Sequence, residues 1–145
     1  MLNRILGVFL VGMLPFLAFA QANGKGPGII TQTRYVKLFG ELENQLLQSS
    51  TDAAKLDTLL TSTFEVRRSD GQTIPRNEWI ALSKNAASAK DSNISQLAVY
   101  EIGSYAVANF HLKGPDQAEK FIVDIWIPEN DQWHLRARME SPVAK

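Results

Sequence analysis

The closing segment of the chain constrains the fold most. Two runs, Glu119–Pro128 and Gln132–Ser141, are rich in β-branched and aromatic residues that alternate in character, which is typical of paired strands. Asn130 and Asp131 between them tolerate positive φ and therefore predict a two-residue turn. Because such a turn fixes the register of its strands, the sequence predicts a long antiparallel hairpin with Glu129 opposite Gln132.

This register sorts the side chains of the hairpin into two faces. One face is apolar apart from a single carboxylate and holds Ile122, Asp124, Trp126, Leu135, Ala137 and Met139. The other mixes apolar and charged residues and holds Phe121, Val123, Ile125, His134, Arg136, Arg138 and Glu140. Asp124 then lies opposite Ala137. The alternative, a three-residue loop over Glu129–Asp131, places Asp124 opposite Arg136 in a solvated ion pair.

The first 20 residues have the pattern of a secretory signal peptide. Arg4 precedes an uncharged apolar run over residues 5–19, which closes on the small-x-small sequence Ala18–Ala20. A retained membrane anchor is disfavoured, because the run is shorter than the roughly 20 residues that span a bilayer and contains Pro15. The sequence therefore predicts cleavage after Ala20, a periplasmic or secreted protein, and no stable membrane anchor after cleavage.

The composition excludes several partners and chemistries. Removing Arg4 from the 15 basic residues leaves 14 against 15 acidic residues, a net charge of −1. This balance leaves no excess of positive charge with which to bind nucleic acid or an anionic membrane surface. The chain has no cysteine, so thiol chemistry is excluded. Its two histidines, His111 and His134, fall on different predicted strands without metal-ligand spacing, so we expect no metal and no cofactor.

The rest of the chain divides into a glycine-rich leader, residues 21–30, and one domain, residues 31–143. Helical spacing and capping residues predict three helices. The first runs from Thr31 to Ser49, and the third runs from Asn77 to Ala87, after Pro75. The second follows the N-cap candidates Ser50–Asp52 and carries Leu56, Leu59 and Leu60. Alternation predicts the strands Phe64–Arg67, Thr73–Ile74, Ile94–Ile102 and Tyr105–Lys113. Helices followed by a run of antiparallel strands indicate an α+β domain.

From Thr31 to Pro142 this order resembles the nuclear transport factor 2-like superfamily. The residues that carry the resemblance are Asp52–Leu56, Leu59–Leu60, Phe64, Ile74–Trp79, Asp124–Trp126, Trp133 and Ser141–Pro142. The chain looks most like secreted bacterial members whose function is unknown. The resemblance implies a cone: a curved antiparallel sheet, in the order α-α-β-β-α-β-β-β-β, wrapped on three N-terminal helices.

The superfamily includes ketosteroid isomerase, SnoaL-like cyclases and kinase hub domains. Similarity to ketosteroid isomerase places Asp124 on that family's buried, hydrogen-bond-donating aspartate. The general base, however, falls on Arg68 and the catalytic tyrosine on Asn44. An arginine cannot abstract a proton at neutral pH and an asparagine is no phenol. Asp124 is therefore the one catalytic candidate, and no catalytic residue is assigned.

Asp124 also centres the expected ligand site inside the cone. The odd-numbered face of Tyr105–Lys113 should lie beside it, and the predicted inner face of the last three strands holds no lysine or arginine. Such a carboxylate loses hydration, which is expected to raise its pKa unless a cation or several hydrogen-bond donors compensate. The candidate ligand-binding residues are Asp124, Trp126, Tyr100, Tyr105, Asn109, His111 and Met139.

Three functions stay open at this point. The first is a module without catalysis that binds a small apolar molecule or forms a homodimer through the outer sheet face. The expected apolar part of that face consists of Leu97, Val99, Phe110, Phe121, Val123 and Ile125. Its expected polar part consists of the interleaved Arg136, Arg138 and Glu140. The second is an enzyme, isomerase, cyclase or lyase-like, that acts on a small apolar substrate with Asp124 as acid, base or donor. The third is a structural domain with a filled core. One ionisable group without a paired base is poor for proton shuttling, which favours the first.

Overall fold

The computed structural model of the chain describes residues 32–85 and 91–143 and confirms the α+β prediction, with the expected order of elements. The elements are α1 (Gln32–Gln48), α2 (Ala53–Leu59), β1 (Leu60–Arg68), β2 (Thr73–Pro75), α3 (Arg76–Asn85), β3 (Asn93–Ile102), β4 (Tyr105–Lys113), β5 (Glu119–Glu129) and β6 (Gln132–Pro142). The expected signal peptide and leader lie outside the described residues. No described helix has the length and apolar character needed to cross a membrane.

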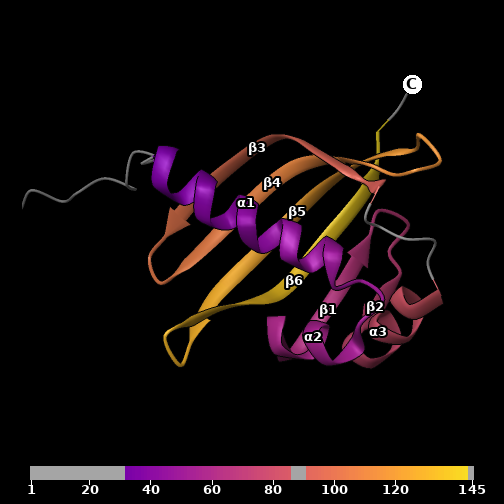
Figure 1. Cartoon of the computed structure of the whole chain (residues 1–145), viewed down its shortest axis with the longest axis horizontal. Coiled ribbons are helices and arrows are strands. Elements are labelled where there is room, and N and C mark those ends of the chain that lie inside the picture. Colours follow the sequence, from indigo (N-terminus) through magenta and orange to yellow (C-terminus); the bar gives the residue numbers. More distant parts are fainter. Residues whose placement is uncertain (1–31, 86–90, 144–145) are drawn as a thin grey trace, which may run out of the picture.

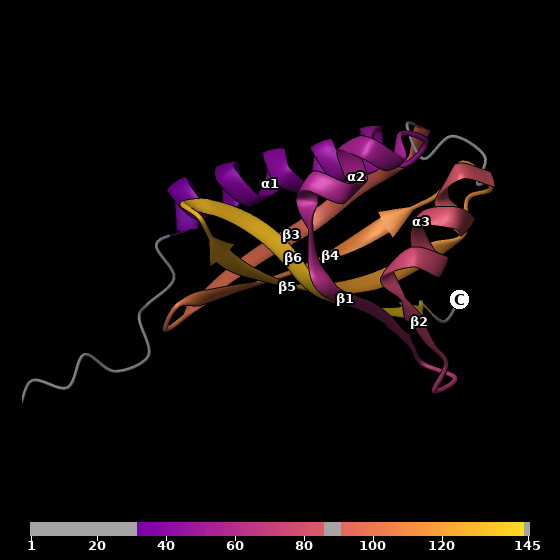
Figure 2. The same cartoon turned by 90° about the horizontal axis from the view of Figure 1, so that it is seen from below.

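One curved sheet carries the whole fold, with strand order β2-β1-β6-β5-β4-β3 (Figure 1). The three helices lie on the same side of it, here called the inner face, and the opposite outer face has no described element on it (Figure 2). β1 pairs with β6 in parallel, whereas the other neighbours are antiparallel. The sheet is therefore mixed and not wholly antiparallel as expected, because the β3–β6 meander brings its last strand beside β1 in the same direction.

The helices dock through apolar stripes, as their spacing predicted. Phe39 and Leu46 of α1 are buried against the sheet, and Leu56 is buried on α2. Asp52 caps α2, because its carboxylate accepts a hydrogen bond from the Lys55 backbone N–H at 3.2 Å. α2 is shorter than expected, since Leu60 is already the first residue of β1.

The predicted turn of the hairpin is confirmed, but the register beyond it is not. Asn130 and Asp131 have φ of 51° and 62°, and Glu129 pairs with Gln132. Trp126 then pairs with Leu135, whereas Ile125 pairs with Ala137. One residue of β6 is thus unmatched, which is a β-bulge.

After the bulge at Arg136, each residue of β6 faces the opposite side of the sheet from the one expected. Asp124 pairs with Arg138, so both expected registers, with Ala137 or Arg136 opposite, are wrong. Arg138 points inward and is buried, while Met139 lies on the outer face and is 39% exposed. The expectation of an inner face without a cation is wrong for the same reason.

The expected faces of β3 and β4 are also exchanged. Asp124 pairs with Ala108 and Phe110 pairs with Ile122, so the even-numbered residues of β4 face inward. Tyr105, Val107, Asn109 and His111 therefore lie on the outer face. Leu97, Val99 and Phe110, expected outside, pack inside instead: Val99 and Phe110 are buried and Leu97 packs against the core. Both faces of β4 carry apolar residues, so alternation alone did not identify the inner one.

Candidate functional site: a buried carboxylate and guanidinium cluster

Three ionisable side chains meet at the centre of the inner face. Arg138 of β6 donates to Asp124 of β5 through Nε, at 2.9 Å from Oδ1, and through a terminal nitrogen, at 2.5 Å from Oδ2. The same terminal nitrogen donates to Oε2 of Glu43 on α1, at 3.1 Å. Asp124 and Glu43 are fully buried and Arg138 is nearly so. The cluster therefore joins α1 to the two strands of the closing hairpin.

Two tryptophans complete the surroundings of the cluster. The indole N–H of Trp126 donates to Oε1 of Glu43 at 2.9 Å, so both Glu43 oxygens accept a hydrogen bond. The Arg138 guanidinium lies 5.9 Å from the ring centroid of Trp79 on α3, close enough for a cation–π contact. Asp124, which was expected to be free to act on a ligand, is instead enclosed in this hydrogen-bonded cluster.

The cluster holds two carboxyl groups and one cation, and the pKa values follow from that imbalance. Burial raises the pKa of Glu43 well above its ordinary value, and the charge of Asp124 raises it further. Arg138 and Trp126 lower it, but by less. Burial also lowers the pKa of Arg138, yet Asp124 and Glu43 outweigh this effect and leave it above its ordinary value. Arg138 therefore stays charged, and the Glu43 carboxyl group releases its proton only at a higher pH than usual.

Sequence reasoning missed Glu43 and Arg138. Glu43 lies four residues after Phe39 and three before Leu46, on the buried stripe of α1, so its position on that stripe was the available signal. Arg138 could not be found without the bulge.

The structure separates the expected ligand-binding residues. Asp124 and Trp126 face the interior together, whereas Tyr100, Tyr105, Asn109, His111 and Met139 lie on the outer face. Arg68 and Asn44, at the catalytic positions of ketosteroid isomerase, are exposed, and Arg68 donates to the Gln72 side chain at 2.8 Å. The expected ligand-binding residues therefore do not line one site together, and their binding of a ligand stays a prediction.

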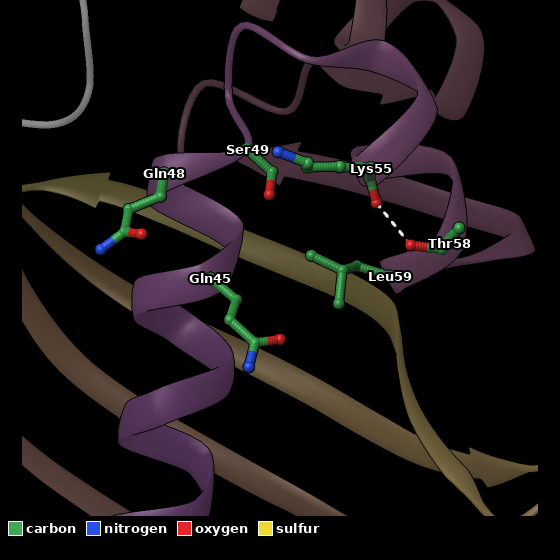
Figure 3. Close-up of a pocket in the computed structure, with 6 residues that line it drawn as sticks. All are labelled: Gln45, Gln48, Ser49, Lys55, Thr58 and Leu59. Atoms are coloured by element: carbon green, nitrogen blue, oxygen red, sulfur yellow. Dashed lines mark hydrogen bonds between the residues drawn. The ribbon is translucent and has the colours of Figure 1, made fainter.

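A groove of about 650 Å³ lies away from the cluster, between the end of α1 and α2 (Figure 3). Its walls are mostly amides and hydroxyls, with Lys55 at one side, from Gln45, Gln48, Ser49, Lys55, Thr58 and Leu59. The Lys55 ammonium lies 3.4 Å from the Asp52 carboxylate. The groove can offer hydrogen bonds to a polar molecule but no acid and base pair. Within residues 32–85 and 91–143, no group of three His, Asp or Glu residues could hold a metal.

Comparison with solved structures gives the class of fold. An NTF2-like protein from Cytophaga hutchinsonii has a TM-score of 0.64 at 15% identity, over 74% of this chain and 97% of that one. An NTF2-like protein of unknown function from Silicibacter pomeroyi has a TM-score of 0.62 at 14% identity, over 79% and 100%. A CaMKII hub from S. rosetta has a TM-score of 0.61 at 15% identity, over 74% and 95%.

The chain therefore has the nuclear transport factor 2-like fold, as its resemblance implied. No protein-family profile and no curated protein matches the sequence. At these identities the similar structures establish the fold alone, and they assign no ligand or reaction to this chain.

Glu43→Gln should change how stability depends on pH. The folded pKa of Glu43 lies above its ordinary value of 4.5, so its contribution to stability is complete below about pH 4.5. That contribution is lost as the pH rises from there through the folded pKa, by at most about 1.4 kcal/mol per pH unit. We expect the variant to gain stability relative to the wild type across this window in denaturant titrations. Glu41→Gln, on the exposed side of α1, is the control; parallel curves for wild type and Glu43→Gln would contradict the assignment.

Arg138→Met should destabilise the protein strongly. It leaves Asp124 and Glu43 buried without their cation, and breaking a buried pair in this way costs about 3–5 kcal/mol. Arg136→Met, two residues earlier, removes one hydrogen bond to the Thr63 carbonyl and should cost about 1 kcal/mol. Urea unfolding of both variants measures the difference. Equal losses would show that the cluster does not hold the hairpin to α1.

Proposed function

We propose that this protein is an exported assembly module without catalytic activity, which forms a homodimer through the outer face of its sheet. The observation that carries the proposal is the apolar character of that uncovered face. Its large apolar side chains are between 36% and 46% exposed: Tyr100, Ile102, Tyr105, Phe121 and Met139. The half-buried Val107, Val123 and Ile125 lie between them. A contiguous apolar patch of this kind marks an interaction surface.

Polar groups at the edge of this patch fit the usual anatomy of an interface. His111 contacts Glu119 at 2.7 Å and packs edge-on against Phe121. Arg67 pairs with Glu65 at 2.7 Å on the other side. These pairs replace the polar portion expected from the sequence, because Arg138 is buried inside. The fold also occurs in a CaMKII hub.

The burial of Asp124 and its contacts with Arg138 argue against the enzyme alternative. An acid or base must come within hydrogen-bond reach of its substrate. Asp124 is fully buried, and both of its oxygens accept hydrogen bonds from Arg138. The same contacts disfavour a small apolar ligand next to Asp124.

Val123→Lys should convert the dimer into a monomer. Val123 lies in the outer face between Asn109 and Met139, so a lysine there places a charge at the dimer contact. Sedimentation at micromolar concentration should show half the wild-type mass. Gln48→Lys adds the same charge on α1, on the inner side of the sheet, and should leave the mass unchanged. A monomeric wild type, or a dimeric Val123→Lys variant, would refute the proposal.

Export should remove the first 20 residues. The basic start, the short apolar run and the Ala18–Ala20 end are the features that signal peptidase recognises. Intact mass of the protein from the periplasm or medium should begin at Gln21. Ala20→Glu should leave the longer species in the membrane fraction. If the wild type also starts at Met1 and partitions with membranes, the segment is an anchor.

A further inference from the structure

The buried cluster contains one more carboxyl group than its cation can neutralise. Arg138 forms a bidentate pair with Asp124, through Nε at 2.9 Å from Oδ1 and through a terminal nitrogen at 2.5 Å from Oδ2. Glu43 shares that terminal nitrogen at 3.1 Å, and its other oxygen accepts a hydrogen bond from the uncharged indole of Trp126. Glu43 is therefore the carboxyl group of the cluster that has no cation of its own.

The elements around Glu43 supply no second cation. Within the described residues, Glu43 forms one ion pair, that with Arg138 on β6, and the charge of Asp124 on β5 repels it. Further along β6, Glu140 adds negative charge near Arg138 and pairs with Lys120 at 3.1 Å. α3 and β3 contribute aromatic and apolar side chains there. An ionised Glu43 is thus a charge without a counterion in the protein interior, which is strongly unfavourable.

Glu43 is also a large part of what holds α1 on the sheet. Three side chains are buried within residues 35–48 of this helix: Phe39, Glu43 and Leu46. Phe39 packs against Trp126 and Trp133, with ring centroids 6.1 Å and 5.1 Å apart. The remaining buried contact of the middle of α1 is the ionisable one. A change in the charge of Glu43 therefore acts directly on the docking of this helix.

The neighbouring helix gives α1 little support. The groove of about 650 Å³ lies between the last turns of α1 and α2, and Figure 3 shows the two helices on either side of it. α2 is fixed separately, because Asp57 pairs with Arg76 of α3 and Leu56 is fully buried. α1 can therefore leave the inner face as one unit while α2 stays in place, which is a local opening of the fold.

We propose that the cluster is a pH-operated latch for α1: at low pH a protonated Glu43 holds the helix on the sheet, and at higher pH an ionised Glu43 leaves the interior and the helix detaches. Detachment gives the carboxylate its hydration back and removes the cost of burying it. It also uncovers the rings of Trp126 and Trp133 on the inner face. Because α1 lies on the side of the sheet opposite the outer face, the latch does not require the proposed homodimer (Figure 2).

The direction of the pH effect follows from linkage. Burial and the charge of Asp124 raise the pKa of Glu43 in the closed form above its ordinary value of 4.5, and a detached α1 returns it to that value. Between these two values each opening releases one proton. The equilibrium constant for opening should therefore rise by up to about tenfold per pH unit in this window.

Thiol labelling measures the opening of α1, because the chain has no cysteine of its own. Leu46→Cys places a buried thiol on α1, and Leu56→Cys makes the same change at a buried position of α2 as the matched control. Each variant is labelled with dithiodipyridine from about pH 5 to 8, the range into which burial moves carboxyl groups. Each rate is divided by that of the same variant in urea at the same pH, which cancels the change in thiolate fraction.

The normalised rate for Leu46→Cys should rise with pH by up to about tenfold per unit and should exceed that for Leu56→Cys by at least ~10-fold. Adding Glu43→Gln to Leu46→Cys should keep the rate low and independent of pH, because a carboxamide does not ionise. Adding Glu41→Gln, on the exposed side of α1, should leave the pH dependence intact.

Two results would overturn the latch. Equal normalised rates for the two thiols would show that α1 opens only when the whole protein unfolds. A pH dependence that survives Glu43→Gln, or no pH dependence in its absence, would show that Glu43 does not control the opening.

If Leu46→Cys does not fold, hydrogen exchange of the unlabelled protein replaces it. After correction for intrinsic exchange, the amides of α1 should lose protection as the pH rises in the wild type and keep it in Glu43→Gln. The amides of β4 and β5 should keep their protection in both proteins. Loss of protection in α1 and in these strands together would overturn the latch.

Discussion

The rest of the structure depends on the contact of Arg138 with Asp124 and Glu43. Burying three ionisable groups carries a large desolvation cost. The hydrogen bonds between the guanidinium and the two carboxylates offset this cost, and the loss of one partner leaves it uncompensated. The cluster ties a helix near the start of the described chain to a hairpin at its end. Apolar contacts such as Phe39 against Trp126, with ring centroids 6.1 Å apart, surround it. Because the polar groups must meet one another, the cluster also selects one register of β6 over its neighbours.

The bulge at Arg136 makes that contact possible and shows where prediction from sequence stops. The order of elements, the Asn130–Asp131 turn and the Asp52 cap are local features, set by residues close in sequence, and each was predictable. The bulge carries no glycine or proline that would announce it. It arises because Arg138, fourteen residues from Asp124 and ninety-five from Glu43, has its partners on the inner side. A single extra residue then reverses every later side chain of the strand.

The candidate site was likewise predictable from the sequence only in part. Asp124 and Trp126 lie on β5, which has no extra residue, and were placed correctly inside, whereas Met139 follows the bulge on β6 and was not. The residues of β4 failed for another reason, because Ala106 and Ala108 are small enough to look like surface positions beside Val107. Their burial on the inner face, beside Trp126 and Asp124, is a tertiary effect. Propensity and alternation do not contain that information.

The placement of charge and apolar surface supports the proposed assembly role. In a cone that binds a ligand, polar groups face a cavity and the outer sheet carries the usual mixture of residues. Here the central ionisable groups satisfy one another, while tyrosine, isoleucine, phenylalanine and methionine side chains remain in solvent on the other side. In the proposed homodimer, the apolar surface that drives association therefore lies on the outer face. Since the cluster fixes the register of the strands beneath it, the residues of the proposed interface are already in place before association, which lowers the conformational entropy lost on binding.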